Sequence, residues 1–208
     1  NAMQGLQAAG RGSEVIAANL SNVLTPGYGL RVLDLSSNAT SSSGGVKVDG
    51  ISRQVNESLI QDKRLAEAGN ANASVIHSLY STIENMIGAP DEPSSLTAQL
   101  ATLETDLLTA ASRPDAPERL STAVASARNL ANSFVKASNT LQDARSDADR
   151  TIGTQVDRLN SALVQVKALN TQITKSQVQG NLNHALLDQR QVLIDEISTL
   201  VPVRTIPR

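Results

Sequence analysis

Apolar residues recur with the period of an α-helix through most of this chain, most regularly between residues 120 and 173. The spacing there averages about 3.5 residues, which is typical of the seam between helices of a coiled coil. At a rise of about 1.5 Å per residue, a helix over 116–176 would be about 90 Å long. We predict one such helix, with Phe134 in the middle of its buried face. Gly153 is its weakest point, because glycine costs about 1 kcal/mol in a helix interior.

Weaker helical periodicity flanks the long helix on both sides. It predicts helices over 4–20, over 54–88, from a cap at Ser94 or Ser95 to just before Pro114, and over 181–200. Gly88 and the Thr25-Pro26-Gly27 turn are natural stops, since proline cannot continue a helix and glycine permits a turn. Because three of these stretches share their apolar spacing, we expect 116–176 to pack antiparallel against 54–88 and 181–200.

The non-helical segments lie between the first two helices. Residues 36–45 are rich in serine and glycine, which is typical of a loop or linker. Val46 to Asp49 alternate apolar and polar residues, and Ile51 follows, which predicts a short strand or one arm of a hairpin. The predicted fold class is therefore mainly α: an elongated helical bundle with long coiled-coil-like helices and a short β segment near residues 46–52.

Composition narrows the classes of function. The formal charge of −2 argues against a nucleic-acid or anionic-membrane surface, and the absence of cysteine excludes disulfides and thiolate nucleophiles. About a third of the residues are Ser, Thr, Asn or Gln and only three are aromatic, which lowers the expectation of a small-molecule pocket. Neither His77 nor His184 has enough nearby carboxylates for a metal site. We therefore expect both histidines to lie on the surface. We also expect that the protein is not an enzyme and binds neither a cofactor nor a metal ion.

One short motif stands out at the end of the first predicted helix. It consists of Asn19, Asn22, Thr25, Pro26, Gly27 and Tyr28. From the residues alone, it is a helix ended by a Thr-Pro-Gly turn, with Asn22 near the C-cap. The motif resembles the signature Asn-x-x-Asn-x-x-Thr-Pro-Gly-Tyr of bacterial flagellar axial proteins, which include the rod, hook and hook-associated families.

Later segments narrow the resemblance. The segment from Gly45 to Arg53 and the block Leu186, Leu187, Asp188, Gln189 and Arg190 are similar to the flagellar hook-associated protein 1 family, whose members lie at the hook–filament junction. From the residues alone, Asp188-Gln189-Arg190 is most simply a solvated helix face, and a helix–helix polar contact is the alternative.

The resemblance implies an N-terminal fragment with four parts. These are an inner-tube helix and turn over 1–30, a loop and short strand over 31–53, an elongated helical domain over 54–200 and the start of an outer domain over 201–208. The helical run over 54–200 disfavours a rod or hook protein. A soluble coiled-coil signalling module would explain the 3.5 spacing but not the Thr-Pro-Gly-Tyr turn.

The resemblance also implies partners and a place in the cell. Subunits would form a homo-oligomeric ring in the flagellum, contacting the hook protein and the next hook-associated protein. A cytosolic chaperone would guide unfolded export by the flagellar type III route, which makes the protein secreted and extracellular. The 4–20 helix contains two glycines and would lack its C-terminal partner helix, so we expect the isolated fragment to be a monomer with a loosely held N-terminal segment.

Overall fold

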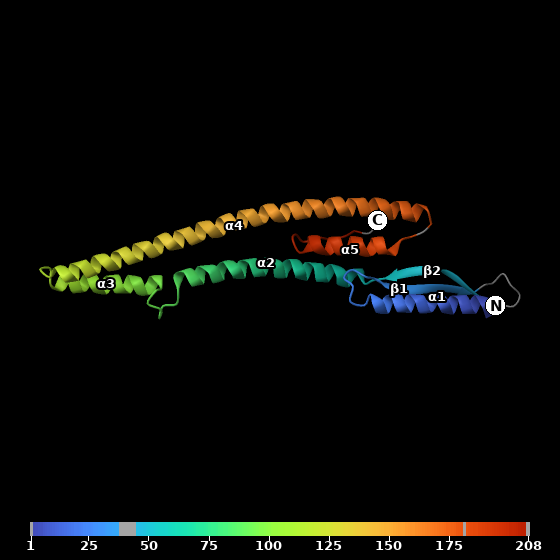
Figure 1. The fold of residues 1–208 in the computed structure, drawn as a ribbon, viewed down its shortest axis with the longest axis horizontal. Coiled ribbons are helices and arrows are strands. Elements are labelled where there is room, and N and C mark those ends of the chain that lie inside the picture. Colours follow the sequence, from blue (N-terminus) through green and yellow to red (C-terminus); the bar gives the residue numbers. More distant parts are fainter. Residues whose placement is uncertain (1, 38–44, 181, 207–208) are drawn as a thin grey trace. The chain divides into compact units, whose positions relative to one another are not determined.

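The computed structural model describes residues 2–37, 45–180 and 182–206, and within these ranges it contains five helices and two strands (Figure 1). The chain divides into two compact units: Asn1–Gly69 with Arg158–Arg208, and Asn70–Asp157. The elements are α1 (Ala2–Ser21), β1 (Leu30–Ser37), β2 (Val46–Gln54), α2 (Glu57–Ile87), α3 (Leu96–Ser112), α4 (Pro117–Val178) and α5 (His184–Ser198). The predicted mainly α class is confirmed.

The helix ends follow from local chemistry. Ser95 caps α3, because its hydroxyl accepts a hydrogen bond from the Ala98 amide at 3.1 Å. The last helical residue of α3 is Ser112, just before Pro114. Pro117 opens α4, a position where its missing N–H costs nothing. The helix then continues without a break through Gly153 to Val178, as the regular apolar spacing predicts.

The two strands form an antiparallel hairpin that is larger than the sequence predicts. β1 pairs with β2 from Leu30 opposite Gln54 to Ser37 opposite Val46, with an irregularity at Asp34 and Leu35. Ser36 and Ser37 belong to β1, so the predicted loop over 36–45 is wrong at its start, and residues 38–44 lie outside the described ranges. Composition misleads here because the pairing of Ser36 with Lys47 and of Ser37 with Val46 decides the strand, and strand preference depends strongly on such context.

The end of the hairpin carries an acidic group with a lowered pKa. Hydrogen bonds from Ser36 and Lys47 hold the pKa of Asp49 below its usual value of 3.8, since both favour the ionised carboxylate. The Lys47 ammonium lies 3.1 Å from Asp49 Oδ1, and both side chains are exposed.

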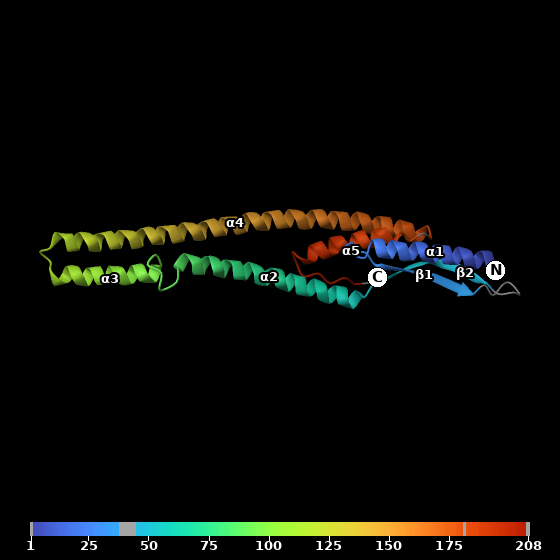
Figure 2. The same ribbon diagram turned by 60° about the horizontal axis from the view of Figure 1, so that its bottom comes forward.

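The first helix packs against the hairpin. Figure 2 shows α1 alongside β1 and β2, and contacts join it to both strands. Ala8 and Val15 are its buried residues. A Cβ atom at Gly12 would lie 3.9 Å from Leu33 Cδ2, so this glycine faces β1 at ordinary van der Waals distance. Gly12 weakens the helix but does not obstruct its packing on the strand.

In the unit Asn70–Asp157, α3 and the first part of α4 contact each other through small and polar side chains. Ser126 donates to Asp106, and Ser133 donates to Gln99 Oε1 at 2.8 Å. Both pairs have the same sum of residue numbers, as antiparallel helices require. Ala123 and Leu130 are the buried apolar residues of this face.

The predicted burial of Phe134 is wrong, because 56% of this residue is exposed. Of the predicted seam, Leu130 is buried, whereas Leu120 and Ile152 are exposed as well. The contact face runs through Ala123 and Ser126, beside the line of large apolar residues rather than along it. Small side chains let two helices approach closely, and periodicity among large apolar residues does not reveal them.

In the other unit, α5 lies between parts of α2 and α4. Arg64 of α2 donates to Asp195 at 2.6 Å, and Arg158 of α4 donates to Glu196 at 2.8 Å. The buried residues of α4 and α5 in this unit include Ala162, Ile173, Ile197 and Ser198.

Candidate functional site

The candidate site is the junction where the turn after α1, the hairpin and α5 meet, all within one compact unit. It brings together the six signature residues, two strand arginines and the aspartate of the Leu186–Arg190 block. We call this group of residues the Asp188 clamp: it consists of Asp188, the residues that donate to it (Gly29, Arg31 and Arg53) and Gln191, which bonds Arg53.

Asn19 joins the end of α1 to the first strand. Its Nδ2 donates to the Arg31 carbonyl at 2.8 Å, and its Oδ1 accepts from the Arg31 amide at 2.9 Å. The side-chain amide therefore bonds both main-chain groups of one residue, as a neighbouring strand would. Its Oδ1 also accepts from the Tyr28 hydroxyl at 2.9 Å. These three bonds set the direction in which β1 leaves the helix.

Asn22 and Thr25 close the turn itself. Asn22 Nδ2 donates to the Ala18 carbonyl at 2.9 Å, which satisfies one of the free carbonyls at the end of α1. The Thr25 amide donates to the Asn22 carbonyl at 2.9 Å, and the Tyr28 amide donates to the Thr25 carbonyl at 3.2 Å. Pro26 lies between these donors, at a position where its fixed φ suits the turn.

Gly27 and Gly29 let the chain run directly against α5 and β2. Gly27 has φ +75°, and a Cβ atom there would lie 2.4 Å from Val192 Cγ2 and 3.0 Å from the Asp188 carbonyl oxygen. A Cβ at Gly29 would lie 2.5 Å from Arg53 Nε. Any side chain at Gly27 therefore meets both backbone strain and a clash with α5.

Asp188 accepts hydrogen bonds from three donors on the other side of the junction. Its Oδ1 accepts from the Gly29 amide at 3.1 Å and from Arg53 Nε at 2.7 Å. Its Oδ2 accepts from Arg31 Nη2. The three charged side chains are only 10–14% exposed, so water screens the ion pairs weakly.

The remaining nitrogens of the two arginines find different partners. Arg53 Nη2 donates to Gln191 Oε1 and, at 3.4 Å, to the Gly27 carbonyl. The Arg31 guanidinium carbon lies 4.9 Å from the centre of the Tyr28 ring, and Arg31 Nη1 is buried without a hydrogen-bond partner. The ring face attracts the cation through its quadrupole. The clamp thus holds two positive charges and one negative charge in a mostly buried place.

The sequence interpretation of Asp188 needs correction. Asp188 is neither on a solvated face nor in a helix–helix contact, because it bonds the hairpin and the turn. Its neighbour Gln189 is exposed, as on a solvated face, and Arg190 Nη1 donates to Asn170 Oδ1 of α4 at 3.4 Å, which is a helix–helix polar contact. Leu186 and Leu187 are half-buried on the same helix.

Arg31 and Gln191 were not identifiable as site residues from the sequence. Arg31 lies directly opposite Arg53 in the strand pairing, an arrangement that destabilises a sheet unless an anion lies between them. The pairing register reveals this requirement, and Asp188 meets it. The sequence pattern does not predict β1, so it cannot show that Arg31 pairs opposite Arg53.

His184 also bonds the hairpin, which corrects the prediction of a free surface histidine. Its Nε2 lies 2.6 Å from the Ile51 carbonyl oxygen, and its Nδ1 is buried without a partner. His77 is exposed on α2. Within the described ranges, no group of three or more His, Cys, Asp or Glu residues could hold a metal ion.

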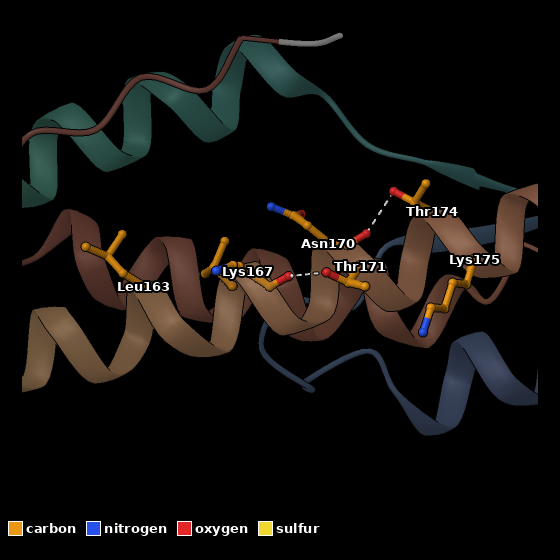
Figure 3. A pocket seen from close by; sticks show the side chains of 7 residues that line it. Leu163, Lys167, Asn170, Thr171, Thr174 and Lys175 are labelled. Atoms are coloured by element: carbon orange, nitrogen blue, oxygen red, sulfur yellow. Dashed lines mark hydrogen bonds between the residues drawn. The ribbon is translucent and has the colours of Figure 1, made fainter.

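A shallow groove of about 590 Å³ lies along α4 (Figure 3). All of its lining residues come from this helix: Leu163, Val166, Lys167, Asn170, Thr171, Thr174 and Lys175. Thr171 and Thr174 donate to main-chain carbonyls one turn earlier, at 3.0 and 2.9 Å. The lining contains two lysines but no Asp, Glu or His, so no acid–base pair converges there. Among the described helices, none is long and apolar enough to cross a membrane.

Comparison with known proteins identifies relatives over nearly the whole chain. The model of the family described as flagellar hook-associated protein FlgK helical domain matches residues 80–208. Flagellar hook-associated protein 1 of Escherichia coli (strain K12) is 28% identical over 211 residues, covering 98% of this chain, and the protein of Salmonella typhimurium has the same values. The Bacillus subtilis protein of that name is 35% identical over 75 residues, 36% of this chain. The chain spans 38% of the length of the first two relatives.

Proposed function

Since the chain belongs to the family of flagellar hook-associated protein FlgK, we propose that it is part of a structural subunit that joins the hook of the bacterial flagellum to the filament. The observation that carries the proposal is the match of the helical-domain family over residues 80–208. Alignment of 98% of the chain with relatives named flagellar hook-associated protein 1 supports it for the N-terminal residues as well.

The mechanism we propose is assembly by contact rather than catalysis. The side-chain oxygens of Asn19 and Asp188 are used in bonds within the candidate site, which suits a junction that sets the direction of α1. Along α1, Met3, Leu6, Ile16 and Leu20 are exposed. Burying such side chains against neighbouring subunits would contribute roughly 25 cal/mol per Å² of apolar surface.

The partners follow from the same proposal. The subunits form a ring of identical copies, with hook protein on one side and the next hook-associated protein on the other. The protein is exported unfolded through the flagellar type III route with a cytosolic chaperone, and it acts outside the cell at the hook–filament junction. We propose four parts with different roles: an inner-tube helix and turn over 1–30, a connection over 31–53, a helical domain over 54–200 and the start of an outer domain over 201–208.

Deletion of the gene that encodes this chain, in the bacterium that carries it, tests the proposal. We expect cells with hooks but without filaments in electron micrographs, loss of swimming, and filament subunits released into the medium. A plasmid copy of the full gene should restore the filaments. Filaments of normal number and length on the deletion strain would refute a role in joining hook to filament.

A further inference from the structure

The helix α1 and the hairpin pack mainly against each other. Contacts join α1 to both strands, and the two strands to one another. Among the apolar side chains of the hairpin, Leu30, Leu35 and Ile51 are exposed, and Leu33, Val46 and Val48 are half-buried. The attachment of the hairpin to α5 therefore depends on the contacts that cross directly between them.

A network of polar contacts crosses to α5. It comprises the bonds of Gly29, Arg31 and Arg53 to Asp188, the bond of Arg53 to Gln191, and the contact of His184 with the Ile51 carbonyl. The close approach of Gly27 to Val192 adds a small apolar contact. Attachment by a charged network differs from attachment by apolar burial, because loss of one charge leaves its partners buried and uncompensated.

We infer that the Asp188 clamp is a latch: α1 and the hairpin form one body that is docked on α5 through Asp188 and is released when a neutral group replaces that carboxylate. Without the charge, Arg31 and Arg53 lie opposite each other in the pairing with no anion between them. Undocking returns both guanidinium groups to water, whereas the α1–hairpin contacts do not depend on Asp188. This conformational device is independent of the proposed role at the hook–filament junction.

Spin labels on the whole 208-residue chain test the latch by double electron–electron resonance. The chain has no native cysteine, so introduced cysteines are labelled specifically. One labelled pair, Lys47→Cys with Gln189→Cys, reports the distance from the hairpin to α5. The other pair, Glu14→Cys with Lys47→Cys, reports the distance from α1 to the hairpin. The three labelled positions are exposed.

In Asp188→Asn, we expect the hairpin–α5 distances to become longer and broader while the α1–hairpin distances keep the parent distribution. The ratio of docked to undocked molecules should fall at least about 100-fold, as for other buried ion pairs that lose one partner. Asp188→Glu, which keeps the charge, should remain mostly docked. Asp147→Asn, the same change at an exposed ion pair of α4, should have no effect on either distance.

Three outcomes would overturn the latch. Unchanged hairpin–α5 distances in Asp188→Asn would show that other contacts hold the two together. Broadening of both distances, or loss of helical circular dichroism, would show that Asp188 supports the fold itself rather than the docking. Release in Asp188→Glu equal to that in Asp188→Asn would show that the charge is not the determinant.

Discussion

The ion pair between Arg64 and Asp195 offers a direct test of how α5 is held against α2. Arg64 is only 3% exposed, and its Nε donates to Asp195 Oδ1 at 2.6 Å. The Asp195 side chain is 21% exposed. Asp195→Ala therefore leaves a buried guanidinium without its counter-charge. Because the carboxylate is partly exposed, water can reach the place it leaves, which reduces the loss of stability.

Breaking a buried pair from one side costs about 3–5 kcal/mol. Because Asp195 keeps partial contact with water, we expect Asp195→Ala to lower the free energy of unfolding by about 3 kcal/mol. Replacing both members by apolar residues of similar volume, Arg64→Met with Asp195→Leu, should cost about 1 kcal/mol or less, since no charge is then left buried. The difference between these variants separates the penalty of an orphaned charge from the net value of the pair.

Urea unfolding followed by helical circular dichroism measures both variants. The matched control is Asp147→Ala, which removes one member of the exposed Arg150–Asp147 pair and should change stability by less than about 0.5 kcal/mol. A cost below about 1 kcal/mol for Asp195→Ala would show that Arg64 does not need its counter-charge. A double variant as unstable as Asp195→Ala would show that the loss comes from packing rather than from an unpaired charge.

Three further predictions concern the core, the turn and the hairpin. Leu130→Ala should cost about 2–5 kcal/mol in urea unfolding, as deletion of buried methyl groups does, whereas Phe134→Ala should cost about 1 kcal/mol or less; equal costs would contradict the assigned contact face of α4. Gly27→Ala should destabilise by about 1–3 kcal/mol in the same assay through its positive φ alone, and the clash of the added Cβ with Val192 should increase the loss; a neutral effect would contradict both the conformation of this turn and its close approach to α5. Ser36→Ala should raise the pKa of Asp49 toward 3.8 in an NMR titration of its carboxyl resonance. Since the folded pKa is the lower one, the contribution of Asp49 to stability is present above pH 3.8 and is lost as the pH falls through the folded value.

The sequence by itself determined the helices, because their causes are local. Apolar spacing predicts α4 from residue 116 to 176, and the structure extends it from Pro117 to Val178. The cap at Ser95 and the stop before Pro114 depend on groups within a few residues of each other. The signature motif could likewise be found as a helix end followed by a turn, since Asn22 and Thr25 bond within that same turn.

Only the tertiary structure decided which faces and which charges meet. The contact face of α4 follows Ala123 and Ser126 because small side chains let α3 approach, so Phe134 is left exposed. Asp188 finds Arg31 and Arg53 across separations of 157 and 135 residues, once the hairpin has paired in one register. Local patterns carry no information on such encounters, because groups so far apart in the sequence meet only in the folded chain, where their mutual attraction and hydrogen bonds offset the cost of removing them from water.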